Sequence, residues 1–248
     1  MYILRHLLVA AFLVGAVSLQ AAPLTFFSED LNGNPNSRIA FPKSAAARAN
    51  FLAQLSGTAT DTFEEFSGGD SLPLNLTFSG AASATLRADA GFIQTLSSGT
   101  NGFGRFPTSG NNYLETNAPS LSFAFTAPVS SFGFYAIDAG SFGGQLSLVL
   151  TRSGGGNTTV AVPNSVGTGR GSPQNGSVLF FGYIDSASSF SNIQVLDSLQ
   201  VDSFGLDDVT VGIRTSATTP EPYSGVLVGA GLLSIVLFGK KVRIGTIT

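Results

Sequence analysis

Residues 129–137 read Val-Ser-Ser-Phe-Gly-Phe-Tyr-Ala-Ile, and this stretch decides the fold. Successive side chains of a β-strand point to opposite faces, so Phe132 and Phe134 lie on one face and Tyr135 on the other. Apolar side chains on both faces indicate a strand that is covered on both sides. The stretch therefore predicts a central strand of a layered β protein.

Alternating or apolar runs of similar length recur on both sides of this strand. They number about nine to eleven, with glycine-rich turns between them, which favours a two-sheet antiparallel β-sandwich of the jelly-roll type. The chain has 21 phenylalanines and no tryptophan, which suits an apolar core between two sheets. The predicted strands cover residues 62–66, 74–78, 83–88, 113–116, 121–125, 145–151, 158–162, 177–184, 190–196 and 203–212.

The part before the predicted sandwich has a different pattern. Residues 23–42 contain a cluster of turn formers, Asn-Gly-Asn-Pro-Asn at 32–36, and are predicted to be irregular. Residues 43–55 are rich in alanine with helical spacing, and Gly57 is a suitable C-cap. We therefore expect an N-terminal irregular segment and one short helix at 23–59, then the β-sandwich domain at 60–214.

Residues 1–22 have the organisation of a secretory signal peptide. Arg5 and His6 give a positive n-region, and Leu7–Leu19 is apolar. The sequence thus predicts export, with cleavage between about Ser18 and Ala22.

The end of the chain also has three distinct parts. A linker at 215–222 closes with Pro220, Glu221 and Pro222, and an uncharged run of 17 residues follows at 223–239. As a helix this run would measure about 26 Å, near the lower limit for crossing a bilayer. The basic residues Lys240, Lys241 and Arg243 then fit a cytoplasmic stop. Residues 223–248 are therefore predicted to be a transmembrane helix with a basic tail; a buried core helix, a simple single-span anchor and a GPI signal are the alternatives.

The Pro-Glu-Pro motif, the apolar span and the basic end resemble the PEP-CTERM sorting tail of Gram-negative bacteria. This resemblance implies recognition by an exosortase-type processing enzyme, an inner-membrane intermediate, and a final place at the cell surface or in the extracellular matrix. Phrases such as Phe132–Asp138, Phe180–Tyr183 and Phe204–Val209 resemble the jelly-roll domain that often precedes such tails, similar in plan to carbohydrate-binding modules.

Composition excludes several kinds of chemistry. The chain has no cysteine and its one histidine is His6, so the exported part lacks thiolate and imidazole ligands or bases. Residues 23–219 carry fourteen acidic and eight basic side chains, a net charge of −6, with Lys43 as the single lysine. Nucleic acid is therefore not an expected partner, because phosphate binding needs clustered cations.

Acidic side chains near the two ends of the predicted sandwich suggest a calcium site. Calcium takes six to eight oxygen ligands, and the first and last strands of a jelly roll are often neighbours. Glu64 and Asp208, with Asp207 as the alternative to Asp208, are therefore predicted metal ligands. Solvated charges that prevent edge-to-edge pairing are the other interpretation.

Aromatic residues in the strands are the candidates for sugar contact. Tyr113, Tyr135 and Tyr183 are predicted carbohydrate contacts, with core tyrosines whose hydroxyls reach the rim as the alternative. The long loop Ser97–Asn112 contains Phe-Gly-Arg-Phe at 103–106, and loops of this length are either functional or disordered.

Together these features predict an exported, non-enzymatic protein with a structural or adhesive role in exopolysaccharide or biofilm, the matrix role being implied by the family resemblance. A membrane-tethered carbohydrate-binding module is the first alternative. A glycan hydrolase using paired carboxylates is the second, although Glu64 and Glu65 would point to opposite faces of a strand, as would Asp207 and Asp208.

Overall fold

The computed structural model describes residues 22–199 and 202–214, which all belong to one compact unit, Met1–Thr215. Residues 1–21 of the predicted signal peptide lie outside the described residues. The predicted linker and membrane span, from residue 215 onward, also lie outside them. Within the described residues, no helix is long and apolar enough to cross a membrane.

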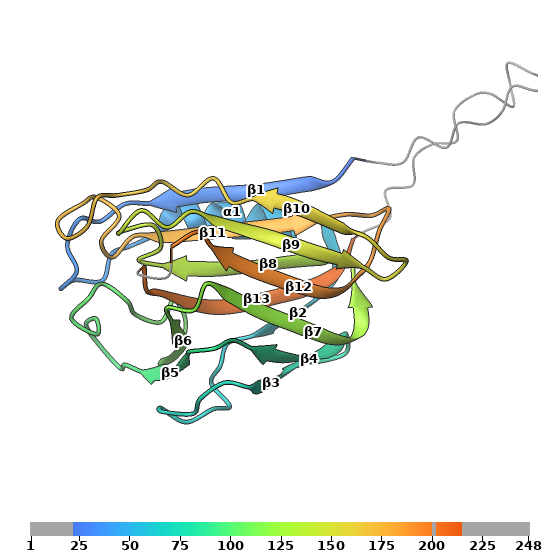
Figure 1. Cartoon of the computed structure of the whole chain (residues 1–248), viewed down its shortest axis with the longest axis horizontal. Helices are drawn as coiled ribbons and strands as arrows, with labels where there is room; N and C mark the ends of the chain where they lie inside the picture. Colours follow the sequence, from blue (N-terminus) through green and yellow to red (C-terminus); the bar gives the residue numbers. More distant parts are fainter. Residues whose placement is uncertain (1–21, 200–201, 215–248) are drawn as a thin grey trace, which may run out of the picture. The chain divides into compact units, whose positions relative to one another are not determined.

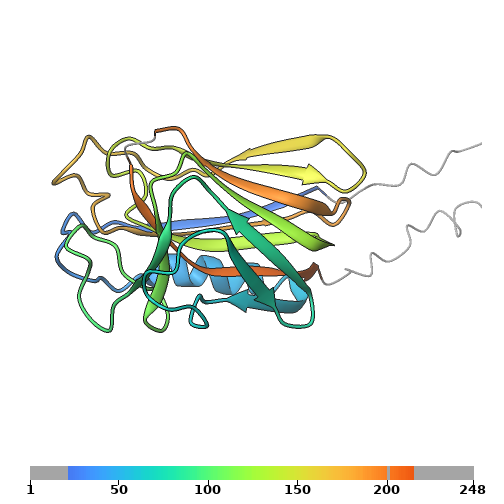
Figure 2. The same ribbon diagram turned by 60° about the horizontal axis from the view of Figure 1, so that its bottom comes forward.

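Two antiparallel sheets lie face to face, with one helix on the outer side of the first (Figures 1 and 2). The helix is α1 (Pro42–Leu52). The first sheet contains β1 (Leu24–Asp30), β2 (Leu55–Asp61), β5 (Phe92–Thr95), β6 (Asn112–Thr116), β8 (Ser131–Ile137), β11 (Val178–Ile184) and β13 (Phe204–Arg214). The second contains β3 (Leu74–Phe78), β4 (Ala82–Arg87), β7 (Ser120–Val129), β9 (Leu146–Arg152), β10 (Asn157–Ala161) and β12 (Phe190–Asp197).

Strand order confirms the predicted fold class. The first sheet contains the order β11-β8-β13-β6 and the second the order β10-β9-β12-β7. From β6 to β9 the chain changes sheet at every step, and it does so again from β10 to β13. These eight strands form the two interlocked Greek keys of a jelly roll.

The core has two parts because β8 and β11 are covered on both faces. Between the sheets, Phe132 of β8 packs edge-on against Phe123 of β7, with ring centroids 5.1 Å apart. On the outer face, Tyr135 and Phe180 pack under Phe51 of α1. The full burial of all seven β8 residues matches the two-sided apolar pattern of 131–137.

A pair of glycines makes room for the helix. Gly133 and Gly182 are register partners on β8 and β11, and a Cβ on Gly182 would lie 2.6 Å from the Phe51 ring. The fully buried Phe51 side chain therefore occupies the space that side chains at these two positions would fill.

The N-terminal part differs from the prediction. The segment expected to be irregular contains β1, which pairs along its whole length with β11, and β2 pairs with the second half of β13. Residues from 24 onward are therefore part of the sandwich, and residue 60 is no boundary. The helix, predicted at 43–55, spans Pro42–Leu52.

Residues 62–66 form a turn instead of the predicted strand. β2 ends at Asp61, whose Oδ1 accepts a hydrogen bond from the Phe63 amide at 3.1 Å, and Phe63 has φ 59°. An aspartate that binds the backbone two residues on favours a turn over a strand. The opposite-face argument for Glu64 and Glu65 therefore does not apply.

Candidate functional site

Loops from distant parts of the sequence meet at one end of the sandwich, on the left of Figure 1. They follow β1, β5, β8 and β10 and precede β13. β13 starts at this end with Phe204, the residue after Ser203, and its eleven residues extend to Arg214, about 33 Å away. The loop end is thus opposite the end where β13 finishes.

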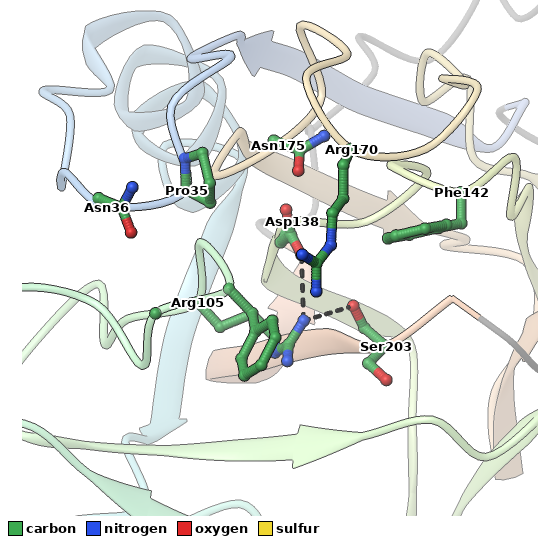
Figure 3. A pocket seen from close by; sticks show the side chains of 10 residues that line it. Pro35, Asn36, Arg105, Asp138, Phe142, Arg170, Asn175 and Ser203 are labelled. Carbon is green, nitrogen blue, oxygen red and sulfur yellow. Dashed lines mark hydrogen bonds and ion pairs between the residues drawn. The ribbon is translucent and has the colours of Figure 1, made fainter.

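A cleft of about 490 Å³ opens among these loops (Figure 3). This volume lies in the range typical of small-ligand sites. Its lining combines two aromatic rings, two arginines, one carboxylate and several amide or hydroxyl groups. The lining residues are Pro35, Asn36, Gly102, Phe103, Arg105, Asp138, Phe142, Arg170, Asn175 and Ser203.

Arg105 forms the floor of the cleft and is only 7% exposed. Its Nη1 donates to Asp138 Oδ2 at 3.1 Å and to the Ser203 carbonyl at 3.2 Å, and its Nη2 donates to Glu115 Oε1 at 3.0 Å. One guanidinium thus joins three separate segments through charge-assisted hydrogen bonds.

The backbone around Arg105 is fixed by its own loop. Asn101 Oδ1 accepts from the amides of Phe103 and Arg105, at 2.9 and 3.2 Å, and Asn101 Nδ2 donates to Glu115 at 2.8 Å. Gly104 has φ +97°, and a Cβ there would lie 2.7 Å from the Gly176 nitrogen. The predicted long loop is therefore ordered, and it needs glycine where it passes residue 176.

Asp138 lies directly after β8, in the left-handed region at φ 65°. Its Oδ1 accepts from the Gly176 amide at 2.7 Å while its Oδ2 pairs with Arg105. Burial raises the pKa of Asp138 to about 7, although the Gly176 hydrogen bond and Arg105 both act to lower it. This carboxyl group can therefore change charge near neutral pH.

Two aromatic rings and one arginine are exposed at the rim of the cleft, and a buried asparagine lies behind them. Phe103 is 55% exposed and Phe142 is 45% exposed, and the guanidinium of Arg105 lies 5.6 Å from the Phe103 ring centroid. Arg170 is exposed and reaches from its loop toward Asp138 and Arg105 (Figure 3). The Asn175 side-chain oxygen points into the cleft, while its Nδ2 donates back to the carbonyl oxygens of Gly169 and Ser172.

The predicted sugar-contact tyrosines lie elsewhere and are buried. Tyr113, Tyr135 and Tyr183 are each at most 4% exposed, so the expectation that they present rings to solvent is wrong. The Tyr113 hydroxyl donates to Glu115 Oε2 at 3.1 Å, and Tyr135 packs beneath Phe41. All three lie on strands of the first sheet, which is covered on both faces: Tyr183 belongs to the core between the sheets and Tyr135 to the cluster under α1. The alternative interpretation as core tyrosines describes all three.

Each of the three predicted metal ligands contacts the loop 108–112. Glu64 Oε1 accepts from the amides of Asn111 and Asn112 at 2.8 and 2.6 Å, and Asp207 Oδ2 accepts from the Thr108 amide at 2.7 Å. Asp208 accepts from the Ser109 hydroxyl at 2.6 Å and pairs with Arg48 at 3.8 Å. These carboxylates thus hold protein donors, and among the described residues no three acidic side chains gather as a metal site. Calcium binding there stays a prediction.

The remaining predicted site residues are Pro220, Glu221, Pro222, Lys240, Lys241 and Arg243, and all lie outside the described residues. The cleft residues themselves were not among the predicted sites. The length of the loop 97–112 was the one signal that pointed to part of the cleft, because long ordered loops tend to be functional.

Comparison with known proteins gives a fold likeness and no family. No family model matches the chain, and no curated protein sequence matches it.

Among solved structures, the K2 cleaved adhesin domain of Lys-gingipain is 14% identical with a TM-score of 0.37, covering 63% of this chain and 100% of that one. The C-terminal family 22 carbohydrate binding module of Clostridium thermocellum Xyn10B is 14% identical with a TM-score of 0.36, covering 66% and 96%. The CBM22-1 xylan-binding domain of Paenibacillus barcinonensis Xyn10C is 14% identical with a TM-score of 0.32, covering 64% and 94%. Likenesses this weak carry no argument about what this chain binds.

Proposed function

We propose that this β-sandwich is a non-catalytic polysaccharide-binding module of an exported protein. The observation that carries the proposal is the cleft at the loop end, where Phe103 and Phe142 expose their rings beside amide and hydroxyl groups. Sugar rings have apolar faces that lie on aromatic rings, and hydroxyl edges that need hydrogen-bond partners. A cleft with both kinds of group matches both requirements.

The acidic side chains that line the cleft and two other hollows do not favour a hydrolase. Asp138 lines the cleft, whereas Glu115 lines a separate hollow of about 220 Å³, and a single guanidinium holds both. They are therefore not placed to flank one glycosidic bond.

Asp61 and Glu65 line another hollow, but their carboxyl groups hydrogen-bond to each other. The two carboxyl groups of a glycosidase are about 5 Å or more apart so that the bond fits between them. This pair is too close for that role.

Binding to a polysaccharide panel tests the proposal. The purified full-length chain in mild detergent is titrated calorimetrically with soluble neutral and acidic polysaccharides. We expect binding to at least one of them, and a loss of about tenfold or more when Phe103 and Phe142 are both changed to alanine. Phe92 is 40% exposed and lies outside the cleft, so Phe92→Ala is the matched control. Failure to bind any member of the panel, or equal losses in both variants, would contradict the proposal.

We propose in addition that the chain is exported and sorted by its Pro-Glu-Pro tail through an exosortase-type enzyme, by way of an inner-membrane intermediate. The tail's resemblance supports this. Mass spectrometry of the C-terminus of the protein from native cells tests the sorting: cleavage near 220–222 is expected, and an intact 223–248 at the cell surface argues against it.

A further inference from the structure

The two arginines of the cleft differ in how their charges are balanced. Arg105 is buried between the carboxylates of Asp138 and Glu115, so its charge is already neutralised by the protein. Arg170 is exposed at the rim, and no hydrogen bond or ion pair to it is found among the described residues. The cleft therefore contains one cation without a protein partner, directed inward (Figure 3).

This free cation is unusual in its surroundings. The exported region has fourteen acidic and only eight basic side chains. Its general field therefore repels anions, and a cation held at the mouth of the cleft gives a local exception. Arginine also presents a planar set of donors that matches a carboxylate in a bidentate manner.

We propose that the cleft selects an acidic polysaccharide, with Arg170 binding the carboxylate of a uronic acid unit. The inference rests on the proposed polysaccharide-binding function and narrows its ligand. Phe142 lies next to the Arg170 loop, because a Cβ on Gly169 would be 3.5 Å from its ring. A sugar ring on Phe142 would thus bring its substituents within reach of the Arg170 guanidinium, and Asn36, which lies across the cleft from Phe142, would be available to a neighbouring sugar unit.

A sugar fits the cleft better than an acidic peptide does. Two of the usual ways of binding a peptide need either an open strand edge with which its backbone pairs or a cluster of arginines for an acidic motif, and this cleft is lined by loops with one accessible arginine. Its two exposed rings suit flat apolar faces, and its polar groups are dispersed amides and hydroxyls. One accessible arginine also falls short of the cation cluster that a nucleic acid would need.

Matched ligands test the charge requirement directly. The purified full-length chain in mild detergent is titrated with polygalacturonate, alginate and hyaluronate, and with each polymer after chemical reduction of its carboxylates to alcohols. We expect at least one acidic polymer to bind about 10- to 100-fold more tightly than its reduced form, the range expected for one charge-assisted contact. The difference should shrink as salt is added.

Variants of arginine then assign the contact. Arg170→Gln should reduce binding of the acidic polymer to the level of the reduced one, while Arg170→Lys should retain part of the preference. Arg87 is an exposed arginine on β4, outside the cleft, so Arg87→Gln should change nothing. Equal melting temperatures of all three variants would show that folding is unaffected.

The outcomes separate the two proposals. Tight binding of a neutral polymer that depends on Phe103 and Phe142, but not on Arg170, would overturn the acidic ligand and leave the polysaccharide-binding function standing. Binding of acidic polymers that is unchanged by Arg170→Gln would also overturn it. Absence of binding to every polymer would overturn both proposals, and binding of acidic peptides in place of sugars would do the same.

Discussion

Replacement of Arg105 by methionine tests whether a single buried guanidinium holds the cleft together. Methionine keeps most of the length and volume of the side chain but removes the charge and all donors. The change leaves Asp138, whose side chain is 3% exposed, and Glu115, which is 16% exposed, without their cation. Breaking a buried ion pair from one side typically costs about 3–5 kcal/mol.

The structure allows this range to be narrowed. Glu115 keeps hydrogen bonds from Asn101 and Tyr113 and some contact with water, so little of the cost arises there. Asp138 can avoid an unpaired charge by taking up a proton. At pH 8.5 we therefore expect Arg105→Met to lower the free energy of unfolding by about 2–4 kcal/mol.

The cost should depend on pH in a defined direction. The pKa of Asp138 is raised to about 7 by burial even with Arg105 present, and loss of the cation raises it further. Both proteins hold this proton at pH 5.5, whereas at pH 8.5 only the variant must bind a proton or bury an unpaired charge. The destabilisation should therefore fall to about 1–2 kcal/mol at pH 5.5, since each pKa unit of difference corresponds to about 1.4 kcal/mol.

Urea unfolding followed by circular dichroism at the two pH values measures both quantities. Arg170→Met is the matched control, because Arg170 lines the same cleft but is exposed, and its replacement should stay within about 0.5 kcal/mol at either pH. A cost for Arg105→Met below about 1 kcal/mol at pH 8.5, or one that increases as the pH is lowered, would refute the structural role given to this residue.

Two further predictions concern the packing and the buried charges. Gly182→Ala should lower the free energy of unfolding by about 1–3 kcal/mol, because its Cβ would lie 2.6 and 2.9 Å from atoms of the fully buried Phe51 ring. A Cβ at Gly57 would meet open space, so Gly57→Ala should leave the free energy of unfolding unchanged in the same urea experiment. Burial raises the pKa of Asp207 to about 8, whereas an aspartate in the unfolded chain releases its proton near pH 4. Between about pH 4 and pH 8 the folded chain therefore holds one more proton than the unfolded chain, and this group lowers the stability of the wild type as the pH rises. Asp207→Asn should therefore reduce the drop in melting temperature between pH 5 and pH 8.5, whereas exposed Asp89→Asn should leave it unchanged; an unaltered drop in the Asp207 variant would count against the buried charge.

Most of the sandwich could be predicted because its strands carry a clear burial pattern. Leu74–Phe78 alternates buried and exposed residues along its whole length, and its predicted bounds agree with β3. β1 was missed because it is an edge strand whose residues are mostly half-buried on both faces. β5 was missed because four residues give too short a pattern to distinguish from a loop.

The expectation that Asp207 and Asp208 point to opposite faces of a strand was wrong for a local reason. Regular alternation would place them on opposite faces, but β13 changes register between Asp207 and Thr210, and Asp208 has φ 49°. This bulge directs both carboxylates toward the loop 108–109. The residue types around the two aspartates do not indicate the bulge, so only the folded arrangement shows that they share a partner.

The cleft was beyond sequence reasoning because its parts are brought together by topology. Asn36, Phe103, Asp138 and Arg170 are more than thirty residues apart in every pairing, and they meet because the loops after β1, β5, β8 and β10 leave the sandwich at the same end. The central role of Arg105 depends on carboxylates from β6 and from the end of β8. A lone arginine in a glycine-rich loop gives no sign of such partners.

The proposed ligand and the proposed tether are linked by one strand. Ser203, whose carbonyl accepts a hydrogen bond from Arg105, immediately precedes β13, and the sorting tail would follow its other end. β13 is paired with β8 on one edge, and with β6 and then β2 on the other. A force between a bound polysaccharide and the membrane would therefore act along β13. It would load the hydrogen bonds of β13 in shear, all at the same time, so that they could not break one after another. The strand that would transmit this load is the one that has paired neighbours on both of its edges.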